Sequence, residues 1–599
     1  MAKGHGELRQ SQLITTFGPG SLLDLPQYSV IVGGLDDWNK GDEVHEPRLA
    51  GKVRQLLDMP TVRFFTPPVD SDDPGAPPVG ITVWQFPEWF ITQDVEEGSK
   101  GRVRTRLLVH RRVVQNSNVF VDEDRRRRQV VPVRFVRGCP KGHVGDIDWR
   151  FFVHADVKGC NRQLRIEERG TSGDLSEVWV ACACGRSRSM TDASMRELHA
   201  LGHCDGKRPW LGAYADEGCK EFNRLLVRSA SNAWFPQVMS VISLPDRNEK
   251  LSGAVTKGWE QLEVVESAEE LKYERKKPLV KSALEGFSDD EVLVEIKARK
   301  GQGETAAAKS VKQAEIEILN ADQAILSGKG AAATFSAELL PKSEWDAQWM
   351  TGIGRVVLIH RLREVMAIVG FTRFEPSSAD IEGELEIGVA RAALAREPSW
   401  FPAIENRGEG VFLGFSKDAI EDWKQRPEVE ARGQQLRKGY EQWLAEHPGA
   451  KRTFPELPYL MLHSLSHLLI TSVALECGYP ASSIRERVYA QPEGYGILLY
   501  TATSDAEGTL GGLIDVGRQI SSHIRAALEM GGLCSNDPVC SQHEPANAHE
   551  RRFLSGAACH GCLLIAETSC EQHNEFLDRA LVVPTLEGLG AEFFRNGGS

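Results

Sequence analysis

The sequence lacks the motifs that mark the common nucleotide-driven and hydrolytic enzymes. Its 599 residues contain no GxxxxGK[ST] phosphate-binding loop, and the nearest match, SGKGAAA at Ser327–Ala333, lacks both the spacing and the hydroxyl. The His-x-Lys pattern followed by Asp, which a phospholipase-like nuclease would need, is also missing. We therefore expect no ATP hydrolysis and no catalytic residues, and we predict that the chain is not an enzyme.

Long apolar runs are also missing. No segment holds about 18 uninterrupted apolar residues, the length of a membrane-spanning helix. The nearest segment, Leu457–Cys477, is typical of a buried core helix because polar residues interrupt it: His463, Ser464, Ser466, His467 and Glu476. Residues 1–6 lead into no apolar segment of the kind that forms a signal peptide. We therefore expect a cytoplasmic protein that does not contact a membrane.

The chain as a whole carries no excess of positive charge, since its formal net charge is −13. Residues 102–137 are an exception, with eleven arginines against three acids. Clustered arginines donate forked hydrogen bonds to phosphate oxygens and gain free energy from counterion release. A face for an acidic protein and a solvated strand face are the alternatives. We predict that eight arginines contact DNA: Arg102, Arg104, Arg111, Arg112, Arg125, Arg126, Arg127 and Arg128.

The twelve cysteines are strongly clustered. Six lie between Cys139 and Cys219, five lie between Cys534 and Cys570, and Cys477 stands alone. Disulfides are rare in the cytosol, where clustered cysteines more often bind metal. We therefore predict structural zinc as the cofactor.

The C-terminal cluster contains two pairs that suit one zinc site. Cys559 and Cys562 have the usual knuckle spacing, whereas Cys534 and Cys540 are more widely spaced around an Asp-Pro turn. Zinc favours four tetrahedral ligands, often thiolates from two tight turns, and four protein ligands indicate a structural rather than a catalytic site. Cys570 is a spare thiol in this interpretation. His543 and His560 are alternative ligands.

The N-terminal cluster allows several partitions into groups of four. One pools Cys139, Cys160, Cys182 and Cys184. Another forms two sites, Cys139/His143/His154/Cys160 and Cys182/Cys184/Cys204/Cys219. Spacing does not choose between these partitions. We expect at least one zinc ion here, and we expect His154, taken alone, to be a core or strand histidine.

Two other patterns carry weaker signals. His463 and His467 lie four residues apart, a spacing that can hold a metal, but the stretch HSLSH lacks the glutamate of an HExxH hydrolase. Packed, hydrogen-bonded core histidines are the favoured interpretation. The glycines of Glu507–Leu513 either bind phosphate before a helix or let a strand approach a helix closely, and we favour the second.

The periodicity along the chain predicts a multidomain α/β (mixed α+β) protein with zinc-ribbon-like inserts. We expect four parts: a β-rich docking region over 1–135, a zinc-binding region over 136–245, a charged helical or mobile insertion over 246–345, and an α/β domain with the C-terminal zinc site over 346–599. Ser416 is expected to cap a long helix that is interrupted near Pro427. No internal repeat is evident.

Two sets of segments carry a family resemblance. The first set, within Leu462–Leu581, comprises LHSLSHLLI, GYPASSIRERVY, YGILLYTA, EGTLGGL, CSNDPVC and GAACHGCLLIAETSCEQHNEFLDRAL. It resembles the zinc-binding domain appended to superfamily-2 helicases of the MrfA type, which implies a four-cysteine site at Cys534, Cys540, Cys559 and Cys562. The second set comprises SQLITTFGPGSLLDL, CPKGHVGDIDWRFFVH, RLREVMAIVGFTRFEP and GEGVFLGF. Together with the first, it resembles the DrmB family of the bacterial DISARM anti-phage system.

The resemblance implies a function in defence against phage. It implies a complex with a DrmA-like superfamily-2 helicase, binding of DNA that is single-stranded or has a single-stranded overhang, and restriction of phage genomes. Two departures are visible: helicase motor motifs are absent, as expected for the DrmB family but not for helicases of the MrfA type, and Arg228–Asn232 reads RSASN where RGASN is expected. The alternatives are a metal-dependent nuclease or hydrolase that uses His463 and His467, and a protein-only adaptor without DNA contact.

A compact apolar plug, Leu8–Pro26, begins the resemblance at the N-terminus. Leu13, Ile14 and Phe17 have the spacing of a short helix, and Gly18 is the expected left-handed cap before Pro19. Terminal segments are ordered only where they are tied down. We therefore expect the plug to be docked, and we hypothesise that it packs against the C-terminal domain.

Overall fold

The computed structural model forms two compact units that interleave along the chain. Unit 1 comprises Met1–Ser240, Val365–Ala379 and Leu385–Glu405, and unit 2 comprises Val241–Glu364, Asp380–Glu384 and Asn406–Ser599. The strands β18, β20 and β21 each contribute residues to both units. The division into four consecutive parts stays a prediction. The structure describes residues 8–25, 28–69, 79–97, 103–115, 118–155, 159–212, 218–244, 251, 254–255, 257–299, 310–321, 334–345, 349–350, 352–375, 383, 385, 390–447, 452–501, 512–547, 550 and 552–595.

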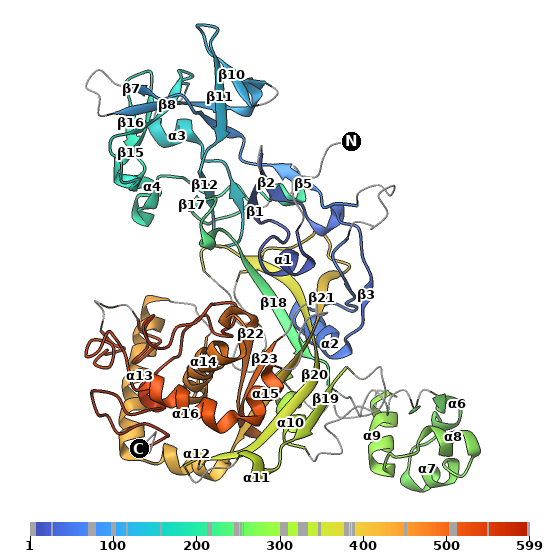
Figure 1. Ribbon diagram of the computed structural model, residues 1–599. Coiled ribbons are helices and arrows are strands. Elements are labelled where there is room, and N and C mark those ends of the chain that lie inside the picture. The colour runs from blue at the N-terminus through green and yellow to red at the C-terminus, as the bar shows by residue number, and fades with distance from the viewer. Residues whose placement is uncertain are drawn as a thin grey trace. The chain divides into compact units, whose positions relative to one another are not determined.

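Unit 1 is built mainly from antiparallel strands (Figure 1). Its largest sheet has the order β16 (Ser187–Ser189), β15 (Val178–Cys182), β14 (Leu164–Glu168), β8 (Arg104–His110), β6 (Trp89–Thr92), β11 (Arg127–Pro132), β10 (Val119–Val121) and β9 (Val114–Gln115), with β7 (Glu96–Glu97) beside β8. Two smaller sheets are β1 (Leu22–Asp24)–β2 (Ser29–Val32)–β5 (Val83–Gln85) and β13 (Val144–Gly145)–β12 (Phe135–Gly138)–β17 (Arg224–Val227). These strands confirm the β-rich character expected from the sequence.

Unit 1 also contains short helices, and one of them, α3, packs against the largest sheet to form a hydrophobic core. The helices are α1 (Gln10–Thr15), α2 (Pro47–Leu57), α3 (Trp149–His154) and α4 (Thr191–Ser194). The core gathers Trp149 and Phe152 of α3 with Ile166 of β14 and Val180 of β15. The short strand β4 (Phe64–Phe65) pairs in parallel with the first residues of β21, and β3 (Glu43–Val44) pairs with β4.

The apolar plug is docked within unit 1. Leu13 and Ile14 are buried, and the indole nitrogen of Trp234 donates to the carbonyl oxygen of Pro19 at 3.1 Å. The left-handed glycine is Gly20, at φ 80°, and not Gly18 as expected, because the helix ends at Thr15 and a turn follows it. A Cβ at Gly20 would lie 2.5 Å from the ring of Phe371. Phe371 lies within residues 346–599, the part that we expected the plug to contact, whereas Trp234 lies before it.

Unit 2 is organised around a β-sheet with helices on both faces. The strand order is β18 (Phe235–Ile242), β20 (Ile353–Thr372), β21 (Phe401–Phe415), β23 (Gly494–Thr501) and β22 (Ile484–Gln491), and β19 (Ser336–Leu339) pairs with β20. Along β23, Ile497 and Leu499 pack with α14 (Leu457–Cys477), whereas Leu498 and Tyr500 pack with α10 (Val311–Leu319). This alternation follows from the two-residue period of a strand.

The helix α14 is apolar around most of its circumference and is buried along most of its length, with Leu475 exposed near its C-terminal end. In the described part of the chain it is the one helix long and apolar enough to cross a membrane, but 83% of its apolar window is buried inside the protein. It contacts β22, β23, α15 (Gly512–Arg518) and α16 (Ile520–Gly531). These contacts confirm the buried core helix expected from the sequence.

The remaining helices of unit 2 follow the expected pattern. Ser416 caps α12 (Lys417–Lys424), accepting a hydrogen bond from the amide of Ala419, and α13 (Pro427–Glu446) resumes at Pro427. A helical lobe with its own core comprises α6 (Trp259–Leu262), α7 (Ala268–Glu274), α8 (Pro278–Ala283) and α9 (Asp289–Arg299), and α11 (Lys342–Trp345) follows later. The glycine turn at 507–511 lies outside the described residues.

Candidate metal centres

The four cysteines of the C-terminal cluster converge at one point. The sulfur of Cys534 lies 3.5 Å from that of Cys559, and the sulfur of Cys562 lies 3.7 Å from those of Cys540 and Cys559. Thiolates at about 2.3 Å from a tetrahedral zinc ion lie about 3.8 Å apart. The observed spacings therefore fit zinc. The structure thus brings together the four cysteines that the sequence predicts as one site.

The loop that carries Cys534 and Cys540 is shaped by a buried arginine. Arg579 is fully buried, and its Nη2 atom donates to Asp537 Oδ1 at 2.5 Å and Oδ2 at 2.6 Å. Asp537 Oδ1 in turn accepts from the amide of Ser541 at 3.1 Å. The Cys562 thiol and the Arg579 guanidinium lower the pKa of Cys540 to about 5. Since the thiolate is the form that binds metal, this environment favours metal binding.

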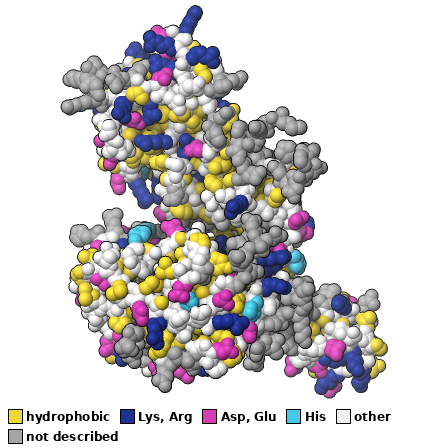
Figure 2. All heavy atoms as spheres, viewed as in Figure 1, with side chains coloured by type: hydrophobic (Ala, Val, Ile, Leu, Met, Phe, Trp, Pro, Cys, Tyr) yellow, Lys and Arg dark blue, Asp and Glu magenta, His cyan; other side chains and the backbone are white. Residues whose placement is uncertain are grey.

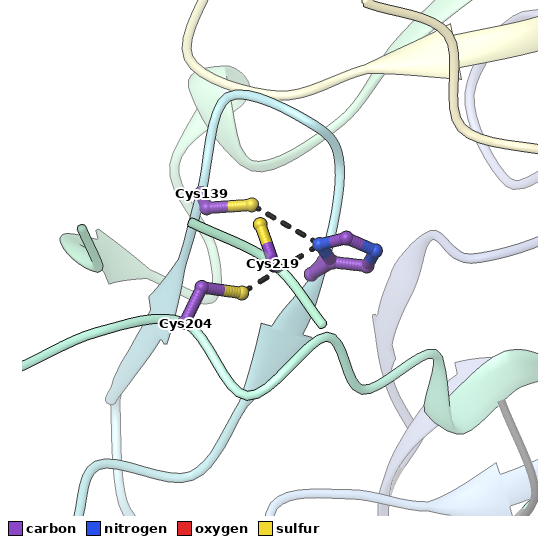
Figure 3. A group of neighbouring side chains, drawn as sticks. Cys139, Cys204 and Cys219 are labelled. Carbon is purple, nitrogen blue, oxygen red and sulfur yellow. Dashed lines mark hydrogen bonds between the residues drawn. The ribbon is translucent and has the colours of Figure 1, made fainter. Parts of the chain in front are cut away.

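A second centre joins the turn after β12 to a later segment of unit 1. Cys139 and His143 lie in a tight turn in which Gly142 has φ 85°. The Nδ1 atom of His143 is 3.3 Å from the sulfur of Cys139 and 3.6 Å from that of Cys204. Cys219 completes the group, with all four ligand atoms within 4.8 Å of one another. Figure 3 shows the three cysteines, on separate segments, pointing toward one another.

A third centre comprises His154, Cys160, Cys182 and Cys184. The ring nitrogen Nδ1 of His154 donates to the carbonyl oxygen of Arg150 at 2.8 Å, which leaves Nε2 facing the sulfur of Cys184 at 3.4 Å. The sulfurs of Cys160 and Cys182 are 3.6 Å apart. A backbone hydrogen bond from Arg186, then His154, lowers the pKa of Cys184 to about 6. Each centre thus offers four protein ligands, which is the arrangement of a structural zinc site.

The two partitions considered from the sequence are both wrong. Cys139 belongs with Cys204 and Cys219 rather than with Cys160, and His154 is a ligand-type residue rather than an isolated core histidine. The pairing of β12 with β17 brings Cys219 toward the turn that holds Cys139, and the bridge between His203 and Phe222 brings Cys204 there; local spacing carries no information about either pairing. His143 and His154 were considered as ligands in one partition, which put them in a single site, whereas the structure places them in two different centres. His543 binds Glu550 and lies outside the C-terminal centre.

A fourth group of ligand-type side chains lies in the core of unit 2. It combines the two histidines of α14, His463 and His467, with Glu486 of β22 and with Cys570. All four residues are buried, as expected for histidines in the core of the domain. The sequence analysis missed Glu486, and it treated Cys570 as a spare thiol.

Comparison with known proteins shows which family the chain belongs to. Residues 9–235 match the model of a domain of unknown function (DUF8724), and residues 465–563 match the MrfA Zn-binding domain. The chain is 30% identical over 482 residues, 78% of its own length and 83% of the relative's, to the DISARM protein DrmB of Bacillus paralicheniformis. The chain belongs to the DrmB family. The DrmB resemblance, the mixed α/β fold and the structural zinc cofactor are thereby confirmed.

The predicted DNA-binding arginines of this DrmB-family chain occupy different environments. Arg102 lies outside the described residues, and Arg104, Arg111 and Arg112 are exposed on β8 and the short helix η2 (Arg111–Val113). Arg128 is buried and its Nε atom donates to Asp122 Oδ2 at 2.8 Å. This ion pair makes Arg128 unsuitable for phosphate contact.

Three consecutive arginines lie in and beside the turn between β10 and β11. We call Arg125, Arg126 and Arg127 the arginine turn; all three side chains are exposed, and no described residue forms an ion pair with them. Asp122 fixes the turn by accepting from the amide of Arg126 at 2.8 Å, and the Arg128 guanidinium lowers the pKa of Asp122. Glu123 and Asp124 are exposed beside them and offset part of the charge. Figure 2 shows Lys and Arg atoms gathered over β10 and β11.

Proposed function

We propose that this chain is a non-catalytic, cytoplasmic subunit of a DISARM-type complex that restricts incoming phage DNA. In this proposal it binds a DrmA-like superfamily-2 helicase and helps to hold DNA that is single-stranded or carries a single-stranded overhang. The observation that carries the proposal is the 30% identity to the DISARM protein DrmB along 83% of that relative. The match to the MrfA Zn-binding domain supports a helicase as the partner.

The arginine turn is the proposed DNA contact of this chain. Its three guanidinium groups are exposed, and of the three acids beside them Asp122 is already paired with Arg128, whereas Glu123 and Asp124 offset part of the charge. Exposed guanidinium groups donate forked hydrogen bonds to phosphate oxygens, and their binding displaces condensed counterions. We expect this contact to be independent of base sequence, because it is made to the backbone.

The metal centres support a structural rather than a catalytic role. Each of the three zinc centres offers four protein ligands, and a catalytic zinc site keeps one position for water or substrate. The alternative nuclease would use His463 and His467, but both side chains are fully buried and cannot reach a polymeric substrate. We therefore favour a scaffold that holds DNA and the helicase over an enzyme.

The experiment measures DNA binding by the purified helicase complex as a function of salt. We expect the triple variant Arg125→Ala, Arg126→Ala, Arg127→Ala to lower the slope of log K against log [salt] by about 2 to 3, since each phosphate contact contributes roughly 0.9. The affinity should fall equally for unrelated DNA sequences. Fluorescence anisotropy with a labelled overhang duplex provides the measurement.

Two matched variants control this experiment. Lysine at all three positions keeps the charge, and we expect it to retain most of the slope. Alanine at Lys272, Lys276 and Lys281, exposed residues of the helical lobe, removes the same charge elsewhere and should leave the slope unchanged. An unchanged slope in the arginine variant, with helicase co-purification intact, would instead support a protein-only adaptor. Failure to co-purify with the helicase would contradict the proposed partner.

A further inference from the structure

The fourth buried group brings four metal-type ligand atoms to one point. His463 Nε2 lies 2.9 Å from Glu486 Oε1 and 3.2 Å from the sulfur of Cys570, and His467 Nε2 lies 3.3 Å from the same carboxylate oxygen. All four ligand atoms lie within 4.8 Å of one another, as in the three zinc centres. The two histidines reach this point together because residues four apart share one face of a helix.

The hydrogen bonds around the group fix the direction of the ring lone pairs. His463 Nδ1 lies 3.2 Å from the carbonyl oxygen of Phe576, and His467 Nδ1 lies 2.8 Å from that of Leu563. A carbonyl can only accept, so both Nδ1 atoms carry hydrogen, and in the neutral ring the Nε2 lone pair then points at the carboxylate and the thiol. Ligating histidines in metal sites are held in this way.

The ligand atoms that converge at this group are electron-rich and need a cation or protons between them. Two Nε2 lone pairs, a carboxylate and a thiolate would repel one another in a buried, low-dielectric site unless cations lie between them. One divalent ion balances the charges of Glu486 and Cys570, and it gives each lone pair an acceptor. The alternative is that both histidines carry a proton on Nε2, so that two imidazolium cations balance the two negative charges.

The sulfur of Cys570 has the surroundings of the zinc ligands elsewhere in this chain. The amide of the residue two positions later, Gln572, donates to it at 3.3 Å. The same contact occurs at Cys204, Cys534 and Cys559, at 3.3, 3.4 and 3.3 Å. A second amide, of Asn574, reaches Cys570 at 3.1 Å. Amide donors stabilise a thiolate, the form of cysteine that ligates metal.

We propose that His463, His467, Glu486 and Cys570 form a fourth metal site, which holds a divalent transition metal ion, with zinc as its occupant. Two imidazoles, one carboxylate and one thiolate are a ligand set that tetrahedral zinc accepts. The site ties α14 and β22 to the segment after Cys562. It is closed to solvent, so the ion is structural and is bound as the unit folds.

The test counts metal ions in the purified full-length protein by elemental analysis and native mass spectrometry. The wild-type chain should hold four ions, and the double variant His463→Gln, His467→Gln should hold three. Glu486→Gln, which removes the anion but keeps the size, should also hold three. The control is His523→Gln, a buried histidine of α16 outside all four groups, which should keep four.

A second measurement needs no variant and therefore does not depend on variant folding. Anomalous difference density at the zinc edge from wild-type crystals should show a peak between the four ligand atoms, at about 2.0 to 2.3 Å from each. Peaks at the three cysteine-rich centres with none at this group would overturn the proposal and would assign the site to protons. Four ions in the histidine double variant would overturn it as well.

Discussion

Arg373 is a fully buried cation that is held by backbone carbonyls. Its Nε atom donates to Gly142 at 2.8 Å, its Nη2 atom to Gly20 at 2.7 Å, and its Nη1 atom to Ala233. No ion pair to it occurs within the described ranges. It therefore links the apolar plug, through Gly20, to the turn of the second metal centre, through Gly142. Hydrogen bonds from a charged donor contribute about 1.5 to 3 kcal/mol each.

The role of Arg373 predicts a large effect for a single substitution. Arg373→Met keeps the apolar stem but leaves three buried carbonyls without their donor, so we expect unfolding free energy to fall by about 3 kcal/mol or more. Thermal melting of the purified chain measures this. Arg437→Met, at an exposed position of α13, is the control and should change stability by less than about 0.5 kcal/mol. Equal melting temperatures for the two variants would refute the bracing role.

Individual ligands were predictable to different degrees from the sequence. Cys534, Cys540, Cys559 and Cys562 come from two local pairs, so spacing and the family resemblance sufficed to identify them. The N-terminal centres could not be partitioned in this way. Their ligands meet through sheet pairing between distant segments, and Glu486 joins its group through the register of β22 beneath α14.

At the scale of elements, α14 is the centre of the unit 2 core. Its faces contact β22, β23, α15 and α16, and the apolar run over Leu457–Cys477 predicted both the helix and its burial. The cap at Ser416 and the break at Pro427 were also predictable, because they depend on local backbone chemistry. The left-handed position of the plug was not, since Gly20 adopts it to approach Phe371, a residue far along the chain.

Two leucines of α14 test its role in the core. Leu469 is fully buried and Leu475 is 75% exposed on the same helix. Leu469→Ala should lower the unfolding free energy by about 2 to 5 kcal/mol, because it removes buried methyl groups and leaves a cavity. Leu475→Ala should change it by less than about 0.5 kcal/mol. Denaturant titration of both variants measures these changes. Similar losses of unfolding free energy in the two variants would contradict the assignment of the buried and exposed faces of α14.

At the scale of the whole molecule, metal centres occur in both units. Unit 1 contains two zinc centres and unit 2 contains the four-cysteine centre. Each centre joins segments that are far apart in sequence, so metal binding contributes directly to the stability of the folded unit. The interleaving of the units was not predictable, because strands as long as β20 and β21 leave no composition shift at the point where they pass from one unit to the other.

The metal content of the purified, folded chain tests this account most directly. Zinc measured by elemental analysis against an independent protein concentration should give at least three ions per chain. Cys559→Ser, Cys139→Ser and Cys182→Ser should each lower that number by one, since each touches a different centre. A folded wild-type chain with fewer than three zinc ions, or cysteine variants that lose none, would contradict the claim that zinc centres hold this DrmB-family protein together.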